Sequence, residues 1–161
     1  MRVTSLRAAL VLALCAGSAT AQTLPLPQNL INLNSNQGAA LLHDSEALQS
    51  YWPLSIQFVT QKNQAFCGVA SIVMVLNALA IPAPTTPEFD PYRTFTQENV
   101  FTPATEKFLP QETVRKIGMT LDQIGGFIST YEVKAEVHHA SDSSVEEFRA
   151  MAKEYLGAQN R

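Results

Sequence analysis

The stretch of sequence that decides the fold is residues 61–80, QKNQAFCGVASIVMVLNALA. Its first four residues are polar, but from Cys67 onward only Ser71 and Asn77 are clearly polar. A helix that is apolar on nearly every face is normally buried inside a domain. If residues 67–80 are helical throughout, the helix is about 21 Å long, which is too short to cross a bilayer. We therefore predict a buried central helix that begins at Cys67.

Cys67 lies where the polar approach turns into this apolar helix. The first turn of a helix has unpaired N–H groups and partial positive charge, and both favour a thiolate over a thiol. Gly68 directly after it allows a substrate to approach the backbone closely, so we predict a substrate-binding role for Gly68. The alternative is a structural cysteine, because free cysteines are often buried and then behave as small hydrophobes.

Two glutamines precede the cysteine on the polar loop. An acyl-transfer nucleophile needs a second hydrogen-bond donor for the developing oxyanion, beside its own backbone N–H. Gln61, six residues before Cys67, can bring its side-chain amide to that place. Gln64 can do so equally well, and the chemistry alone does not decide between them. A cysteine with a nearby glutamine amide indicates nucleophilic acyl transfer.

The sequence of this region resembles the active-site segment of the phytochelatin synthase family. The resemblance is carried by Gln61-x-x-Gln64-Ala65-Phe66-Cys67-Gly68-x-Ala70-Ser71 and by the following residues 74–79, MVLNAL. It is strongest toward the short bacterial members, and compatible sequence extends from about Tyr51 to Arg161. Matched residue by residue, Cys67 falls on the nucleophile of the family and Gln61 on its oxyanion-hole glutamine.

The resemblance implies an α+β, papain-like fold and an activity on glutathione. In the family, the cysteine takes up the γ-glutamylcysteinyl group as a thioester and glycine leaves. The acyl group then passes to water or to a second glutathione, which links the family to phytochelatin synthesis and the heavy-metal response. The resemblance therefore implies glutathione as substrate, with metals arriving as its thiolate complexes, and a possible homodimer. We expect no cofactor and no metal site in the chain itself.

The histidine and aspartate of such a site have no clear counterpart here. Papain-like enzymes place the histidine about 130–150 residues after the cysteine, whereas His138 follows Cys67 by only 71. We therefore expect His138 and His139 to be surface residues. In the family, the histidine and aspartate follow on later strands, so we expect residues 22–161 to be a domain that is incomplete at its C-terminus. Such a chain would hold the helical half, lack most of the sheet half and be nearly inactive alone.

Residues 1–21 have the pattern of a secretory signal peptide. Arg2 and Arg7 give a basic start, an apolar run follows, and Ala19-Thr20-Ala21 forms a small-residue cleavage site. We expect export, most simply to a bacterial periplasm, and no membrane attachment after cleavage. Loss of Cys15 leaves Cys67 as the sole cysteine of the mature chain, and an unpaired cysteine in an oxidising compartment indicates a reactive thiol.

The net charge of −3 and the scattered Lys and Arg residues give no basic patch, so nothing indicates a nucleic-acid partner. Alternating apolar residues predict strand-like segments at 55–60 and 132–139. Residues 82–110, rich in proline and aromatic residues, predict a packed irregular excursion. Helices are predicted over 39–48, 111–117, 120–130 and 144–156, and Gly125-Gly126 predicts close packing of a neighbour.

Three functional classes remain open from the sequence. The first is a glutathione γ-glutamylcysteinyltransferase or glutathione hydrolase, as the resemblance implies. The second is a papain-like peptidase acting on other peptides. The third is an inactive thiol or binding module.

Overall fold

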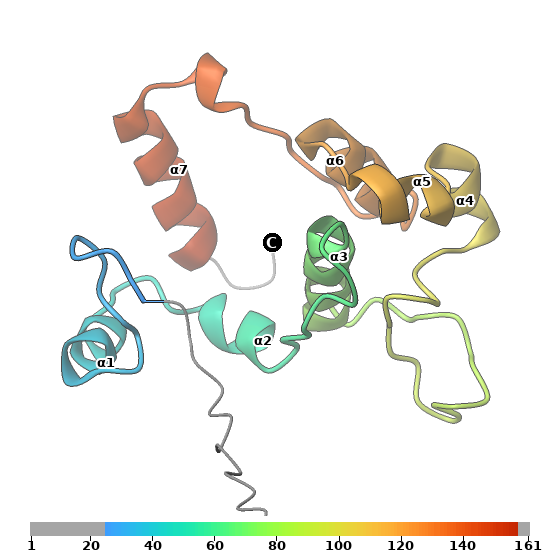
Figure 1. Ribbon diagram of the computed structural model, residues 1–161, viewed down its shortest axis with the longest axis horizontal. Helices are drawn as coiled ribbons and strands as arrows, with labels where there is room; N and C mark the ends of the chain where they lie inside the picture. The colour runs from blue at the N-terminus through green and yellow to red at the C-terminus, as the bar shows by residue number, and fades with distance from the viewer. Residues whose placement is uncertain (1–24, 158–161) are drawn as a thin grey trace, which may run out of the picture. The chain divides into compact units, whose positions relative to one another are not determined.

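The computed structural model describes residues 25–157 (Figure 1). The described residues are helical or irregular, without a β-strand. The predicted signal peptide and Cys15 lie outside the described residues. The helices are α1 (Asn36–His43), α2 (Tyr51–Ser55), α3 (Cys67–Ala78), α4 (Pro103–Phe108), α5 (Gln111–Ile117), α6 (Leu121–Ser129) and α7 (Val145–Gly157), with a 3-10 turn η1 (Ala140–Asp142).

A boundary between two compact units falls after Asp44. In the described part of the first unit, α1 begins directly after Ser35, whose hydroxyl accepts a hydrogen bond from the Gly38 N–H at 3.0 Å. Such a cap satisfies one of the unpaired N–H groups of the first turn. The helix predicted over 39–48 is therefore wrong at both ends, because Ser35 starts it earlier and it stops at His43.

The core of the second unit is built around α3, as the apolar sequence predicts. Val69, Ile72, Val73 and Leu76 on this helix are at most 1 % exposed. α3 packs against α2 and α6, and α6 packs against α4 (Figure 1). The other buried members of the core are Phe66, Ala83, Phe95, Val100, Leu109, Val114 and Phe127. The prediction of a buried central helix that begins at Cys67 is confirmed.

α3 ends two residues earlier than the apolar run. Ala80 has φ 54°, in the left-handed region. Its N–H donates to the Asn77 carbonyl at 3.0 Å, and the Ile81 N–H donates to the Leu76 carbonyl at 3.0 Å. These two bonds form a Schellman motif, which satisfies the last carbonyl groups of a helix and is usually completed by glycine at the left-handed position. The backbone thus turns out of the helix before Pro82 is reached.

The left-handed alanine gives a prediction with an internal control. Replacing Ala80 with glycine removes the Cβ clash of the left-handed conformation, which costs about 1 kcal/mol, and we expect the free energy of unfolding to rise by up to about that amount. Ala78→Gly, two residues earlier within α3, should lower it by about 1 kcal/mol. Denaturant unfolding of both variants measures the difference. Equal effects of the two substitutions would contradict the assigned helix end.

The later helices begin where their caps predict. The Thr120 hydroxyl accepts from the Gln123 N–H at 3.2 Å and the Gln123 side chain accepts from the Thr120 N–H at 2.9 Å, so α6 starts with a complete capping box. The expected close packing at its two glycines is confirmed. A Cβ on Gly125 would lie 2.5 Å from Val137 Cγ2, and one on Gly126 would lie 2.4 Å from Phe108 Cζ.

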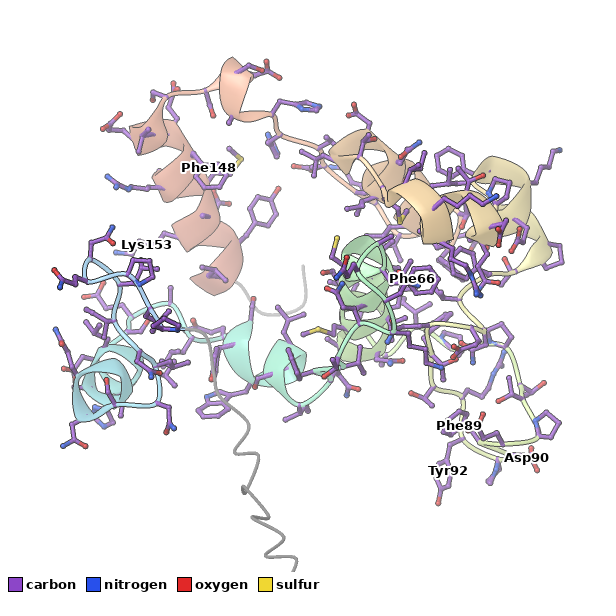
Figure 2. All side chains as sticks on the ribbon, viewed as in Figure 1. Phe66, Phe89, Asp90, Tyr92, Phe148 and Lys153 are labelled. Carbon is purple, nitrogen blue, oxygen red and sulfur yellow. The ribbon has the colours of Figure 1, made fainter. Side chains whose placement is uncertain are left out.

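The proline-rich excursion over residues 82–110 is only partly irregular. Phe95, Val100 and Leu109 are buried in the core, as the prediction of a packed segment requires. Its tip is open, however, and Tyr92 projects from it with 76 % exposure (Figure 2). α4 was not predicted from the sequence; its first turn is capped by Thr102 and tolerates Pro103 because that position needs no N–H donor.

Both predicted strands are wrong. Residues 55–60 begin as the end of α2 and continue as turns, since the Ile56 N–H bonds to the Trp52 carbonyl and the Phe58 N–H to that of Ser55. Residues 133–138 belong to no helix or strand, and none of their backbone groups forms a hydrogen bond to another described segment, so they form no ladder. The α+β expectation is not met in the described residues, and a papain-like arrangement remains a prediction.

α7 is attached to the rest of the second unit by polar contacts rather than by burial, since none of its described residues is buried. The Ser50 N–H donates to the Leu156 carbonyl at 3.1 Å, and Lys153 pairs with Glu46 at 3.1 Å. The Tyr155 hydroxyl donates to Glu136 at 2.5 Å. Glu136 also accepts from Lys134 at 2.6 Å, and together the Lys134 ammonium and the Tyr155 hydroxyl lower the pKa of the Glu136 carboxyl to about 2.

The lowered pKa of Glu136 fixes the pH range over which this attachment acts. A carboxyl whose pKa is depressed on folding contributes stability above its ordinary pKa, and loses that contribution as the pH falls through the folded value. We therefore expect hydrogen exchange of the α7 amides to be slower in the wild type than in Glu136→Gln at pH 6. The difference should shrink below about pH 4.5 and vanish near pH 2. A difference that grows as the pH falls would contradict this link.

Candidate active site

Cys67 is the first residue of α3, and its side chain is exposed. The preceding residue, Phe66, is 2 % exposed and its ring lies 6.1 Å from that of Phe101 (Figure 2). One residue is thus fixed in the core while the next carries its sulfur to the surface. The alternative of a buried, structural cysteine does not agree with this exposure.

The first turn of α3 offers free backbone donors beside the sulfur. The helix is preceded by Phe66, which has no side chain able to cap it. Within the described residues, the N–H groups of Cys67, Gly68 and Val69 have no hydrogen-bond acceptor, and the first bonded amide is that of Ala70, which donates to the Phe66 carbonyl at 2.9 Å. If the sulfur attacked a substrate carbonyl, the resulting oxyanion could therefore accept a hydrogen bond from the Cys67 N–H without displacing an existing bond.

Gln61 lies on the turn that leads into the helix. Asn63 shapes this turn, since its side-chain oxygen accepts from the Ala65 N–H at 2.8 Å and its carbonyl accepts from the Phe66 N–H at 3.1 Å. The Gln61 amide donates to the same Asn63 carbonyl at 2.6 Å. Its nitrogen has a second N–H, which has no acceptor in the part of the chain that the structure describes.

The predicted site residues are not in direct contact with one another. Gln61 and Cys67 form no hydrogen bond within the described residues. Gln64 is exposed like Gln61, so the geometry does not choose between the two glutamines. Gly68 is buried, and a Cβ there would lie 3.1 Å from Met119 Sδ and 3.4 Å from Ile124. The glycine thus lets α6 approach α3, and its role in substrate binding remains a prediction.

A residue that the sequence analysis missed holds the Gln61 loop. Gln97 is 5 % exposed, and its side-chain oxygen accepts from the Lys62 N–H at 3.0 Å while its nitrogen donates to the Thr60 carbonyl at 2.9 Å. The two bonded backbone groups flank Gln61. The Lys62 ammonium also pairs with Glu98, next to Gln97. No local sequence pattern around Gln97 distinguishes it from an exposed glutamine.

Asn77 connects the turn around Phe95 and Gln97 to α3. Its side-chain oxygen accepts from the Phe95 N–H at 2.8 Å, and its nitrogen donates to the Phe95 carbonyl at 3.1 Å. The signal for this residue was present in the sequence, because Asn77 is one of only two clearly polar residues in the apolar run. A polar residue on a buried helix has to find hydrogen-bond partners, and here they are the backbone groups of the turn.

Both histidines near the end of the described chain lie at the surface, as expected. The side chain of His138 is 44 % exposed, with its Nε2 3.8 Å from Glu136. The side chain of His139 is 43 % exposed, and its Nε2 lies 2.9 Å from Asp122 Oδ1. Within the described residues neither histidine forms a hydrogen bond with Cys67.

Two cavities lie away from the sulfur. One, of about 660 Å³, is lined by residues of the 56–62 and 86–99 segments and by Val73 and Asn77 of α3. The other, of about 530 Å³, lies between the extended 134–138 segment and α7. Cys67 lines neither of them.

No cluster of three or more histidine, cysteine, aspartate or glutamate residues within residues 25–157 is arranged to hold a metal ion. None of the helices in this range is both long enough and apolar enough to cross a membrane.

Comparisons with known proteins place the chain in a family. The model of the family described as phytochelatin synthase matches residues 21–161. Glutathione gamma-glutamylcysteinyltransferase 1 of Lotus japonicus is 32 % identical over 129 residues, which cover 78 % of this chain and 24 % of the relative. The protein of the same name from Triticum aestivum is 30 % identical over 134 residues, covering 80 % of this chain and 25 % of the relative. The one from Arabidopsis thaliana is 25 % identical over 142 residues, covering 86 % and 28 %.

The chain therefore spans about a quarter of the length of these relatives. The matched range contains the whole 61–80 segment, with its exposed cysteine and the polar turn before it. Because the family model covers all but the first 20 residues of the sequence, the chain belongs to the phytochelatin synthase family.

Proposed function

We propose that this chain carries the nucleophile and the oxyanion donors of a glutathione γ-glutamylcysteinyltransferase. The observation that carries the proposal is the exposed sulfur of Cys67 at the start of α3, next to backbone N–H groups without acceptors. A nucleophile with a preformed oxyanion donor is the basic requirement of acyl transfer. The membership of the phytochelatin synthase family makes glutathione the substrate of choice.

The chemistry follows in two steps. The Cys67 thiolate attacks the carbonyl carbon that joins cysteine to glycine in glutathione, and the carbonyl oxygen becomes an oxyanion. The Cys67 N–H and the free N–H of the Gln61 amide are the proposed donors to this oxygen. The intermediate then collapses: the C–N bond breaks, glycine leaves with an added proton, and a γ-glutamylcysteinyl thioester remains on the sulfur. Water or the amine of a second glutathione accepts the acyl group and restores the thiolate.

The leaving amine needs a proton from a general acid, which is worth about 10²–10⁴-fold in rate. Neither His138 nor His139 contacts Cys67 within the described residues, so neither is assigned this role. Because no described residue is assigned as this acid, we expect slow acylation and little turnover. Metals would reach the site as thiolate complexes of glutathione.

Mass spectrometry of the acid-quenched chain after incubation with glutathione tests this function. We expect a γ-glutamylcysteinyl adduct on Cys67, one equivalent of released glycine, and neither product with Cys67→Ala. Gln61→Ala should slow adduct formation by about 10²–10³-fold, because one oxyanion donor is lost. Gln64→Ala is the matched control and should leave the rate unchanged.

The other outcomes separate the remaining functions. A slowed reaction in Gln64→Ala instead of Gln61→Ala would move the oxyanion role to Gln64. Adducts from other peptides but none from glutathione would show a peptidase. A sulfur that reacts with iodoacetamide but is never acylated would show a non-catalytic thiol module and contradict the proposal.

We also propose export through cleavage after Ala21, on the strength of the basic start, the apolar run and the small-residue cleavage pattern. N-terminal sequencing of chain secreted by a bacterial host should then begin at Gln22. Replacing Ala21 with a large residue such as Phe should block processing, whereas Thr20→Phe should be tolerated because that position lies between the two small residues. An unprocessed chain retained in the cytoplasm would overturn this proposal.

A further inference from the structure

We propose that Gln97 is a positioning residue that holds Gln61 in place for acyl transfer, an inference that rests on the proposed function. Gln97 is remote from Gln61 in the sequence and does not itself reach the sulfur within the described contacts. It acts on the backbone around Gln61 instead. Its side chain bonds the carbonyl of the residue before Gln61 and the N–H of the residue after it.

The two bonds restrain the Gln61 backbone as a neighbouring strand would. One amide group serves as donor to the Thr60 carbonyl at 2.9 Å and as acceptor from the Lys62 N–H at 3.0 Å. A residue of an adjacent parallel strand bonds its neighbour in the same way, with its own N–H and C=O. Residues 60–62 have no strand partner among the described residues, so the Gln97 amide takes the place of one. Fixing both flanking peptide groups limits the positions that the Gln61 Cα, and therefore its side chain, can take.

Gln97 can do this because its own position is fixed. It is 5 % exposed, and the preceding Phe95 is 3 % exposed within the core. Asn99 ties the turn to itself, since its side-chain oxygen accepts from the Thr96 N–H at 2.7 Å and its nitrogen donates to the Thr94 carbonyl at 2.9 Å. A buried side chain on a rigid turn is a better reference point than an exposed loop.

The 94–99 turn is itself fixed to α3, the helix that carries the proposed nucleophile. Asn77 of α3 bonds both the N–H and the carbonyl of Phe95. Two sets of contacts therefore fix the position of Gln61 relative to α3, the helix that begins at Cys67. One set is the 63–66 turn at the start of α3, and the other runs from Asn77 through the 95–97 backbone and the Gln97 amide to the backbone beside Gln61.

Because Gln97 is buried, losing its amide should strongly affect the position of the Gln61 loop. Removing its amide leaves the Thr60 carbonyl and the Lys62 N–H without these partners, and the loop is free to move to satisfy them with water. A shift of about 1 Å in a group that positions a substrate can lower a rate by about 10²-fold. The exposed ion pair between Lys62 and Glu98 is a weak substitute, because such pairs contribute little.

The test compares two reactions of the same sulfur in the full chain. Acylation by glutathione uses the oxyanion donors, whereas alkylation by iodoacetamide forms no oxyanion. Gln97→Leu, which keeps the size and removes both hydrogen bonds, should slow acylation by about 10–100-fold and leave the alkylation rate unchanged. Gln97→Glu keeps an acceptor for the Lys62 N–H and loses the donor to Thr60, so its acylation rate should lie between those of wild type and Gln97→Leu.

The matched control is Gln123→Leu. Gln123 also bonds a backbone N–H through its side-chain amide, but it does so in the cap of α6 and not in the Gln61 loop. The substitution is identical and removes a hydrogen bond from the fold, so thermal unfolding of both variants shows whether lost stability explains a lost rate. Acylation by Gln123→Leu should match that of the wild type.

A double variant shows whether Gln97 acts through Gln61. In the Gln61→Ala background, Gln97→Leu should cause no further loss of acylation rate, because the group that it positions is gone. Losses that multiply, or equal losses of acylation and alkylation in Gln97→Leu, would overturn the inference while leaving the proposed function intact. An effect of Gln61→Ala without one of Gln97→Leu would do the same. A wild-type sulfur that glutathione never acylates would remove the proposed function and this inference together.

Discussion

The structure depends on the burial of one helix that is apolar on nearly every face. α3 can be stable only inside the second unit, and its residues Val69, Ile72, Val73 and Leu76 are accordingly enclosed by side chains from later segments of the chain. Burial of the helix body fixes where its ends emerge. Phe66 anchors the start in the core, so that the next residue, Cys67, is the first to reach the surface. Cys67, the proposed nucleophile, is thus placed by hydrophobic packing rather than by contacts of its own.

Packing around the helix start also explains the neighbours of the sulfur. Gly68 allows Met119 and Ile124 to lie against the first turn. The first three N–H groups of this turn have no acceptor among the described residues, and the polar turn with Asn63 lies directly before them. The helix start therefore combines a thiol, backbone donors and a side-chain amide within seven residues of sequence. The Gln97 amide bonds the backbone on both sides of Gln61, and Asn77 in turn bonds the backbone of Phe95, near Gln97.

The part of this arrangement that could be predicted from the sequence is the part that depends on local patterns. The start of α3, the threonine cap of α6 and the close packing at Gly125 and Gly126 follow from hydrophobicity, capping and glycine content. The alternation of residues 132–139 predicted a strand, and Val133 does pack against the core while Val137 lies beside Gly125, but a strand also needs a partner, which alternation does not provide. Gln97 was missed because its bonds join positions 35 and 37 residues apart, and nothing local marks them.

The central claim is that the Cys67 sulfur takes up the γ-glutamylcysteinyl group with its oxygen held by the helix start and Gln61. A crystal structure of the chain trapped as its thioester after incubation with glutathione tests this most directly. We predict the acyl oxygen within about 2.7–3.1 Å of the Cys67 backbone nitrogen and of Gln61 Nε2. An acyl oxygen that points to solvent, with Gln61 bonded only to the Asn63 carbonyl, would contradict the account.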